Sequence, residues 1–319
     1  MNEGADTEAG AQADTKADDI AAGPRGSGRL FVVATPIGNL ADITLRALET
    51  LTAVSLIAAE DTRLTRRLLD RHEIATRTTS YHAQSSPGRL AELLAHLRAG
   101  DDLALVTDAG TPSVSDPGEN LVAAWAGEGG TVVPIPGASA VLAVVAGSAV
   151  AGPRWSFEGF LPRSGRERKE RIARIAADER GTIVYEAPGR VATTLGDLAT
   201  ACGEDRPGAI GRELTKLHEE IVRGTLGELA TRARNGELTL RGEFALVVGW
   251  WPNGARGAGD ETGAIQRGRI AGAAATLEAA LAEVDRRVAD GAPRGDAART
   301  VSSETGIPRR KLYRVMDDR

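Results

Sequence analysis

Two loops that follow apolar strands carry the residue types best suited to binding a ligand. The first, residues 35–39 (TPIGN), follows the apolar run 30–34, and the second, residues 108–112 (DAGTP), follows the apolar run 103–106. In an open α/β sheet, ligands bind outside the carboxyl ends of the strands, where glycine and proline let the backbone approach them closely. Neither loop contains a GxGxxG or GxxxxGK pattern, so the sequence does not support a dinucleotide or phosphate-cradling site. We expect both loops to face one crevice that binds another kind of small molecule.

Two further segments place polar or small residues at the same predicted edge. Residues 60–63 (EDTR) come after the apolar run 54–58. There Asp61 either caps a helix over residues 62–71 and pairs with Arg63, or forms a polar wall that binds substrate or takes a proton. Residues 133–140 (VPIPGASA) predict a strand, a turn and a helix start whose small side chains admit a ligand or a neighbouring helix. Both pairs of alternatives stay open.

Basic side chains gather in two places beyond these loops. Residues 163–174 contain six bases and two acids directly after a predicted strand, which is typical of a solvated helix face or of a phosphate-binding rim. Near the end of the chain, a predicted helix over residues 296–304, a turn at 305–306 and a basic helix from Pro308 resemble a helix-turn-helix. A charged terminal helix in a bundle is the alternative. For this segment we favour docking on structured RNA over the reading of a DNA sequence.

The elements that must position these residues predict two α/β domains. Short apolar runs alternate with amphipathic helical patterns from residue 29 to 150, which predicts a mostly parallel, doubly wound sheet, and a second alternation follows the break at residues 151–153. The second alternation includes a strand predicted within residues 219–226. We therefore divide the chain into a disordered acidic tail (1–27), an N-terminal α/β domain (28–151), a second α/β domain (152–252), a linker (253–268) and a helical domain (269–319).

Composition limits the class of protein. The formal net charge of the 319 residues is −5, and the six acids and two bases of residues 1–27 account for −4 of it, so the remainder does not repel an anionic partner. Cys202 is the only cysteine, which excludes a disulfide within the chain and favours a reducing, cytoplasmic setting. The sequence shows neither an apolar run of membrane-spanning length nor a signal peptide.

Seven segments in register resemble one known family. They read VATPIGNL (33–40), AAEDTR (58–63), VTDAGTPSVSDPG (106–118), PIPGASA (134–140), FEGFLPR (157–163), YEAPGR (185–190) and GRELTKLHEE (211–220). Together they resemble the ribosomal RNA small subunit methyltransferase I family, a branch of the tetrapyrrole methylase superfamily. The resemblance spans residues 29 to about 250 and continues into the small C-terminal domain.

The resemblance implies a reaction, a donor and a set of binding residues. It implies that S-adenosylmethionine, held in the cleft between the two α/β domains of a homodimer, methylates the 2′-hydroxyl of cytidine 1402 in the 16S rRNA of the 30S ribosomal subunit. The donor-binding residues would be Pro36, Gly38, Asn39, Asp108, Ala109, Gly110, Thr111, Pro112, Tyr185, Glu186, Pro188 and Leu214. For an RNA acceptor, the basic segments of the chain predict the RNA-binding residues Arg63, Arg163, Arg166, Arg168, Lys169, Arg309, Arg310 and Lys311.

Methyl transfer from a sulfonium needs neither a metal nor a covalent nucleophile, because the donor carries its own leaving group. A ribose hydroxyl is a poor nucleophile, so a general base within hydrogen-bonding reach should help. The candidate catalytic residues are Glu60, Asp61, Glu213 and Lys216. His82 has a suitable ordinary pKa, but a lone surface histidine is seldom functional.

Two other functions remain open from the sequence. One is C-methylation of a tetrapyrrole, which would not require the basic segment 163–174 or the helical C-terminal domain. The other is a non-enzymatic nucleic-acid-binding regulator that uses the α/β domains only to sense a ligand. The AEDTR, DAGTP and RELTK segments disfavour the regulator, because a chain without an active site has no need to keep them.

Overall fold

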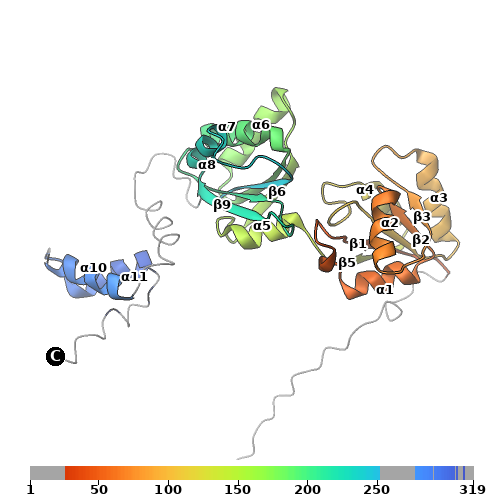
Figure 1. Cartoon of the computed structure of the whole chain (residues 1–319), viewed down its shortest axis with the longest axis horizontal. Helices are drawn as coiled ribbons and strands as arrows, with labels where there is room; N and C mark the ends of the chain where they lie inside the picture. The colour runs from red at the N-terminus through yellow and green to blue at the C-terminus, as the bar shows by residue number, and fades with distance from the viewer. Residues whose placement is uncertain (1–25, 252–276, 290, 306, 308–311, 313–319) are drawn as a thin grey trace, which may run out of the picture. The chain divides into compact units, whose positions relative to one another are not determined.

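The computed structural model describes residues 26–251, 277–289, 291–305, 307 and 312 (Figure 1). The chain forms two compact units, Met1–Trp251 and Pro252–Arg319. Almost all of the predicted tail (1–27) and all of the predicted linker (253–268) lie outside the described residues. So do Arg309, Arg310 and Lys311.

The first sheet is fully parallel. It consists of β1 (Arg29–Val33), β2 (Leu56–Ala59), β3 (Thr78–Ser80), β4 (Leu103–Val106) and β5 (Thr131–Ile135), in the order β3-β2-β4-β1-β5. Helices α1 (Leu45–Ala53) and α2 (Thr62–Arg71) pack on one face, and α3 (Pro87–Arg98) and α4 (Glu119–Gly127) pack on the other. The prediction of a doubly wound sheet is confirmed. The short polar strand β3 was missed because it has no apolar run.

The strand order places a ligand crevice next to β1 and β4. These strands are neighbours, but the chain leaves β1 toward the α1 face and leaves β4 toward the α4 face. Such a switch point opens a crevice at the carboxyl edge of the sheet. Here the two strand-end loops are joined by a pair of backbone hydrogen bonds between Thr35 and Gly110, with N···O distances of 2.8 and 3.0 Å. The expectation that the two loops lie together is confirmed.

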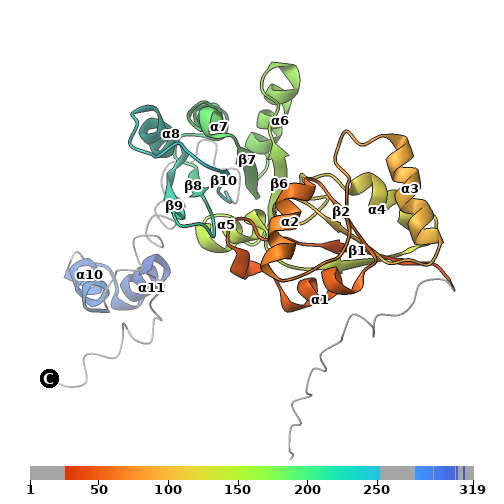
Figure 2. The same ribbon diagram turned by 45° about the vertical axis from the view of Figure 1, so that its right-hand side comes forward.

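The second sheet is mixed. It consists of β6 (Trp155–Phe160), β7 (Gly181–Glu186), β10 (Phe244–Val248), β8 (Pro207–Arg212) and β9 (Glu220–Thr225) in that spatial order, and only β6 and β7 run parallel. Helices α6 (Gly165–Ala177), α7 (Val191–Cys202) and α8 (Leu226–Arg234) enclose an apolar core with one face (Figure 2). The strand predicted within residues 219–226 is present as β9.

Helix α5 (Ala140–Ser148) covers the other face of the second sheet, although it precedes the predicted boundary at residue 151. Val141 and Val144 are buried against Ala209, Ala245 and Val247. The sequence assigned α5 to the first domain because helices and strands alternate there without a break. Its pattern is apolar on nearly every side, so periodicity does not indicate which sheet it covers. Division of the first unit at residue 151 therefore stays a prediction, and α5 links the two sheets.

The described part of the second unit is helical, and the rest of the helical domain predicted over residues 269–319 lies outside the described residues. This unit contains α10 (Leu277–Ala289) and α11 (Arg294–Thr305), which pack together around Ala280, Val284, Ala298 and Val301. Helix α11 matches the helix predicted over residues 296–304. Within the described part of the chain, no helix is long and apolar enough to cross a membrane.

Candidate active site

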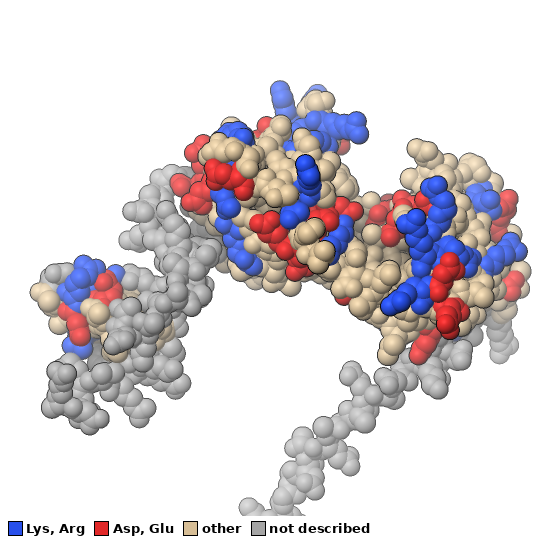
Figure 3. Space-filling view, viewed as in Figure 1, with Lys and Arg blue, Asp and Glu red and all other residues tan. Residues whose placement is uncertain are grey.

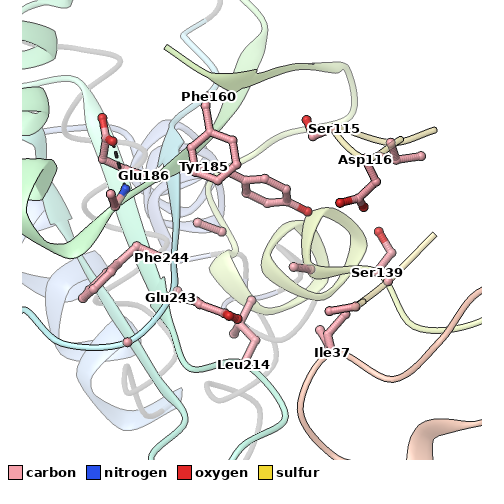
Figure 4. Close-up of a pocket in the computed structure, with 18 of the residues that line it drawn as sticks. Ile37, Ser115, Asp116, Ser139, Phe160, Tyr185, Glu186, Leu214, Glu243 and Phe244 are labelled. Carbon is pink, nitrogen blue, oxygen red and sulfur yellow. Dashed lines mark hydrogen bonds between the residues drawn. The ribbon is translucent and has the colours of Figure 1, made fainter. Parts of the chain in front are cut away.

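A cavity of about 360 Å³ lies in the first unit where the strand ends of the two sheets approach each other (Figure 4). This volume falls within the range of roughly 300–1,000 Å³ that is typical of small-molecule sites. The first sheet contributes the loops after β1 and β4, α5 contributes its first turn, and the second sheet contributes the ends of β6, β7 and β8 and the start of β10. The lining consists of Ile37, Ala109, Gly110, Thr111, Val114, Ser115, Asp116, Ser139, Ala140, Phe160, Tyr185, Glu186, Ala187, Pro188, Gly211, Leu214, Gly242, Glu243, Phe244 and Ala245.

Seven of the twelve predicted donor-binding residues line this cavity. They are Ala109, Gly110, Thr111, Tyr185, Glu186, Pro188 and Leu214. Gly110 has φ +89°, and a Cβ atom there would lie 3.4 Å from a methyl carbon of Ile37. The loop therefore requires glycine where it turns toward the cavity. The predicted residues of the loops after β4 and β7 thus lie in the cavity lining, whereas the loop after β1 contributes Ile37 in place of its predicted neighbours.

The other five predicted donor-binding residues have structural contacts outside the lining. Asn39 caps the short helix Leu40–Asp42, and its side chain accepts a hydrogen bond from the Ala41 amide at 3.1 Å. Asp108 accepts one from the Asp61 amide at 2.9 Å, which joins the ends of β4 and β2. Gly38 packs against the side chain of Lys216, while Pro36 and Pro112 are buried.

Asp61 has the helix-capping role that the sequence left open. Its carboxylate accepts a hydrogen bond from the Arg63 amide and pairs with the Arg63 guanidinium at 2.8 Å. The hydrogen bonds from Arg63 lower the pKa of Asp61 to about 2, so this carboxylate is a poor proton acceptor near neutral pH.

Glu213 and Lys216 form an ion-paired cluster beside the cavity. The Lys216 ammonium lies 2.9 Å from a carboxylate oxygen of Glu213 and 2.9 Å from one of Glu243. Hydrogen bonding to Lys216 lowers the pKa of Glu213. Burial acts against the Lys216 ammonium, but the two carboxylates outweigh it and raise the pKa of Lys216. A protonated lysine cannot accept a proton, and the pKa of Glu213 is lowered, so we do not assign the base to this cluster. The cluster joins the β8–β9 loop to the start of β10.

Glu60 lies at the end of β2, next to the loop that follows β4. One of its carboxylate oxygens accepts hydrogen bonds from the Thr107 hydroxyl at 2.7 Å and from the Asp108 amide at 3.3 Å. Glu60 is thus close to the cavity edge without lining it.

Asp116 and Tyr185 are the ionisable pair that the lining brings together. The Tyr185 hydroxyl points toward the Asp116 carboxylate in Figure 4. Burial, followed by repulsion from Glu60, raises the pKa of Asp116 to about 6, and burial raises the pKa of Tyr185 to about 12. The sequence predicted Tyr185 as a donor-binding residue. It did not single out Asp116, although Asp116 lies in the segment 106–118 that carries the family resemblance. The available signal was its place in the strand-end loop after β4.

A buried polar network supports the end of β7. The Glu186 carboxylate has no exposed surface, and it accepts hydrogen bonds from the Ala187 amide at 2.9 Å and the Thr194 hydroxyl at 2.6 Å. It also pairs with Arg190 at 3.2 Å. The cavity therefore meets Glu186 at its backbone, because its carboxylate is engaged behind the strand.

Arg168 belongs to the same network, which corrects one RNA-binding prediction. It is 7% exposed and donates hydrogen bonds to Asp197 at 2.7 Å, to the Thr194 hydroxyl at 3.0 Å and to the Pro162 carbonyl at 3.1 Å. A guanidinium held in this way docks α6 on α7 and is not available to a phosphate. The six bases of segment 163–174 look alike in the sequence, which did not show that Arg168 differs from the others. In the folded helix the periodicity directs this one base inward.

The remaining predicted RNA contacts are exposed. Arg163 lies just before α6, and Arg166 and Lys169 lie in its first two turns, where Figure 3 shows Lys and Arg side chains projecting from the molecule. Arg63 lies on α2, where Figure 3 shows a second group of basic side chains. Arg66, Arg67 and Arg71 share that helix.

Comparison with known proteins decides the family. The model of the Tetrapyrrole (Corrin/Porphyrin) Methylases matches residues 29–230. The chain is also 45% identical over 288 residues to ribosomal RNA small subunit methyltransferase I of Synechocystis, with 90% of this chain and 97% of that protein covered. The chain belongs to the ribosomal RNA small subunit methyltransferase I family. It is accordingly a methyltransferase of the tetrapyrrole methylase fold.

Solved structures agree on the fold of this methyltransferase. A cobalt precorrin-4 methyltransferase matches with a TM-score of 0.56 and 19% identity, covering 71% of this chain and 97% of that one. The uroporphyrin-III C-methyltransferase of Thermus thermophilus, solved as a complex with S-adenosyl homocysteine, matches with a TM-score of 0.51 and 19% identity, covering 70% and 97%. In the described part of this chain, His, Cys, Asp and Glu side chains form no group of three that could hold a metal ion.

Proposed function

We propose that this methyltransferase uses S-adenosylmethionine to methylate the 2′-hydroxyl of cytidine 1402 in 16S rRNA. The observation that carries the proposal is the 45% identity to an rRNA small subunit methyltransferase over 90% of the chain. The tetrapyrrole methyltransferases match over nearly their whole length with only 70–71% of this chain. The additional length shared with the rRNA enzyme favours an RNA substrate over a tetrapyrrole.

The cavity fits such a donor in size and in chemistry. Tyr185, Phe160 and Phe244 supply aromatic surface for a purine, and the bends at Gly110 and Gly242 bring backbone groups to the cavity wall. S-adenosylmethionine, when bound, supplies an activated methyl group on its sulfonium. The residues of this chain would hold it with its methyl directed toward the acceptor, and such positioning contributes several kcal/mol to the lowering of the barrier.

We propose that exposed bases hold the acceptor. Arg163 before α6, Arg166 and Lys169 on α6, and Arg63 on α2 are exposed, and they would contact phosphates of a folded RNA. Such contacts fix the position of an RNA on the protein without reading its sequence. We also propose that the enzyme acts as a homodimer, without a metal, and in the cytoplasm, as the resemblance and the cysteine content led us to expect.

Purified 30S subunits from a strain lacking this gene provide the direct test. They are incubated with the protein and labelled S-adenosylmethionine, and the modified nucleotide is mapped by mass spectrometry. A 2′-O-methylcytidine at position 1402 is the expected product. If 30S subunits stay unlabelled while S-adenosylmethionine still binds, the rRNA assignment is wrong, and uroporphyrinogen and precorrin substrates are assayed next.

A further inference from the structure

Three acidic residues are among the described residues that line the cavity, and the carboxylates of two of them are already engaged. The Glu186 carboxylate is fully buried behind β7 and pairs with Arg190. Glu243 is largely exposed, and its carboxylate accepts a hydrogen bond from the Lys216 ammonium at 2.9 Å. Asp116 is half-buried and faces the cavity (Figure 4). Of these three residues, Asp116 is therefore the one whose carboxylate remains to accept a proton in the cavity.

Asp116 contacts a short hydrogen-bonded chain that leads away from the cavity. The Thr107 hydroxyl interacts with the Asp116 carboxylate and donates a hydrogen bond to Glu60 at 2.7 Å. Thr107 is 2% exposed and is fixed by β4, whose next residues form the cavity loop. Because a hydroxyl can accept one hydrogen bond while donating another, Thr107 can accept a hydrogen bond from a protonated Asp116 and still donate to Glu60. The protonated form of Asp116 thus has a partner in place.

The surroundings of Asp116 also suit a group that exchanges protons near neutral pH. Burial disfavours its ionised form most, and the negative charges of Glu60 and Asp108 on the first sheet disfavour it further. Tyr185 approaches from β7, and its own raised pKa of about 12 keeps it neutral. A carboxyl group with a pKa of about 6 is ionised at pH 7 yet is more basic than an ordinary aspartate.

We propose that Asp116 is the catalytic base of this enzyme, an inference that rests on the proposed function. As the ribose oxygen forms its bond to the methyl carbon, the carbon–sulfur bond breaks and its electron pair stays on sulfur, leaving a neutral thioether. The hydroxyl proton passes to the Asp116 carboxylate. Charge balances, because one sulfonium and one carboxylate are replaced by neutral products. Thr107 and Glu60 are positioning residues that support the protonated Asp116.

The test compares Asp116→Asn with the wild-type enzyme and with a matched control, Asp205→Asn. Asp205 is exposed and lies outside the cavity lining. Single-turnover methylation of 30S subunits is measured from pH 5.5 to 8.5, and binding of S-adenosylhomocysteine is measured by calorimetry. We expect Asp116→Asn to slow methylation by about 10²–10⁴-fold and to abolish the acidic limb of the pH profile. Affinity for S-adenosylhomocysteine should change less than about threefold, and Asp205→Asn should match the wild type.

A second variant keeps the test valid if Asp116→Asn does not fold. Glu60→Gln removes one of the charges that oppose ionisation of Asp116, so the acidic limb of the pH profile should move to lower pH, whatever the change in the maximal rate. The assignment of Asp116 as the base is overturned by any of three results. Asp116→Asn keeps the wild-type rate and the acidic limb of the pH profile, its defect is explained by lost donor affinity, or Glu60→Gln leaves the acidic limb at the wild-type pH. If the wild-type enzyme itself leaves 30S subunits unlabelled, the proposed function fails, and this inference fails with it.

Discussion

At the scale of single residues, carboxylates that look alike in the sequence have different electrostatic environments. Asp61 caps α2 beside Arg63, which lowers its pKa to about 2. Asp116 lies half-buried near Glu60 and Asp108, and its pKa is raised to about 6. Burial and the sign of neighbouring charge decide which carboxylate can exchange a proton at neutral pH.

Asp116 should reduce the stability of the folded protein at neutral pH. Its folded-state pKa lies above the unfolded value, so the native state binds more protons between pH 4 and 6 and the free energy of unfolding falls as pH rises through that range. Asp116→Asn should therefore raise the free energy of unfolding by on the order of 1–2 kcal/mol at pH 7.5, after allowance for solvent screening, and should have little effect below pH 4. Urea unfolding at the two pH values measures the difference. A gain of equal size at both would contradict the shifted pKa.

The buried carboxylate Glu186 should be important for stability. Glu186→Ala leaves Arg190 and the Thr194 hydroxyl without their buried partner, and we expect a loss of about 3–5 kcal/mol in the free energy of unfolding. Urea denaturation checks this value. The exposed Glu49→Ala on α1 serves as control and should change stability by no more than about 0.5 kcal/mol. An equal effect of the two substitutions would mean that the network does not stabilise the end of β7.

At the scale of elements, one side of helix α6 packs against α7 and another side is exposed to solvent. Arg168 points inward to Asp197 and Thr194 on α7, whereas Lys169, its neighbour in sequence, is exposed. A helix turns by about 100° per residue, so successive bases face different surroundings. The α6 segment therefore contributes to packing on one face and presents exposed bases on another.

This division predicts opposite results for two adjacent substitutions. Arg168→Ala should lower the free energy of unfolding by about 2–3 kcal/mol, somewhat less than a fully buried pair would, because Asp197 is 44% exposed. Lys169→Ala should change it by no more than about 0.5 kcal/mol. Thermal and urea denaturation of the two variants side by side provide the measurement. Similar losses would show that Arg168 is not a packing residue.

The exposed part of α6 should affect RNA affinity without affecting the donor. Arg163→Glu combined with Lys169→Glu should weaken binding to 30S subunits at least tenfold and reduce the salt dependence of binding, while S-adenosylhomocysteine affinity stays constant. The control is a double reversal of Arg232 and Arg234 on α8, which contributes no residue to the cavity lining among the described residues. Filter binding at several salt concentrations measures both variants. An equal loss of affinity in the two would contradict a role of α6 in RNA binding.

At the scale of the whole molecule, all residues that line the cavity lie between Ile37 and Ala245. The two sheets of that region are joined by α5, which packs on the second sheet, and by Lys216, whose side chain packs against Gly38. The apolar core of the C-terminal unit consists of other residues, around Val284 and Val301. The cavity and the C-terminal unit therefore depend on separate apolar cores.

A protein truncated after Trp251 should fold and bind the donor. Because its apolar cores remain complete, we expect a cooperative thermal transition and S-adenosylhomocysteine affinity within about threefold of the full-length protein. Calorimetry and circular dichroism measure both. Loss of cooperative unfolding would show that residues 252–319 are needed to complete the first unit.

The sequence by itself determined the local elements and the family. Apolar periodicity and the loops at the strand ends predicted the doubly wound first sheet, the Asp61 cap as one of two alternatives, and a crevice beside the loop after β4. The family resemblance added the segment after β7. These features depend on neighbours in the chain, so a linear pattern is enough to reveal them.

Only the tertiary structure decided which side chains meet across the two sheets. It placed α5 on the second sheet, turned Arg168 inward, engaged Lys216 with two carboxylates and brought Asp116 to Tyr185. In each case the partner is distant in the sequence or the choice depends on burial. A pKa or a packing partner is set by everything within a few ångströms in space, and a linear pattern does not contain that information.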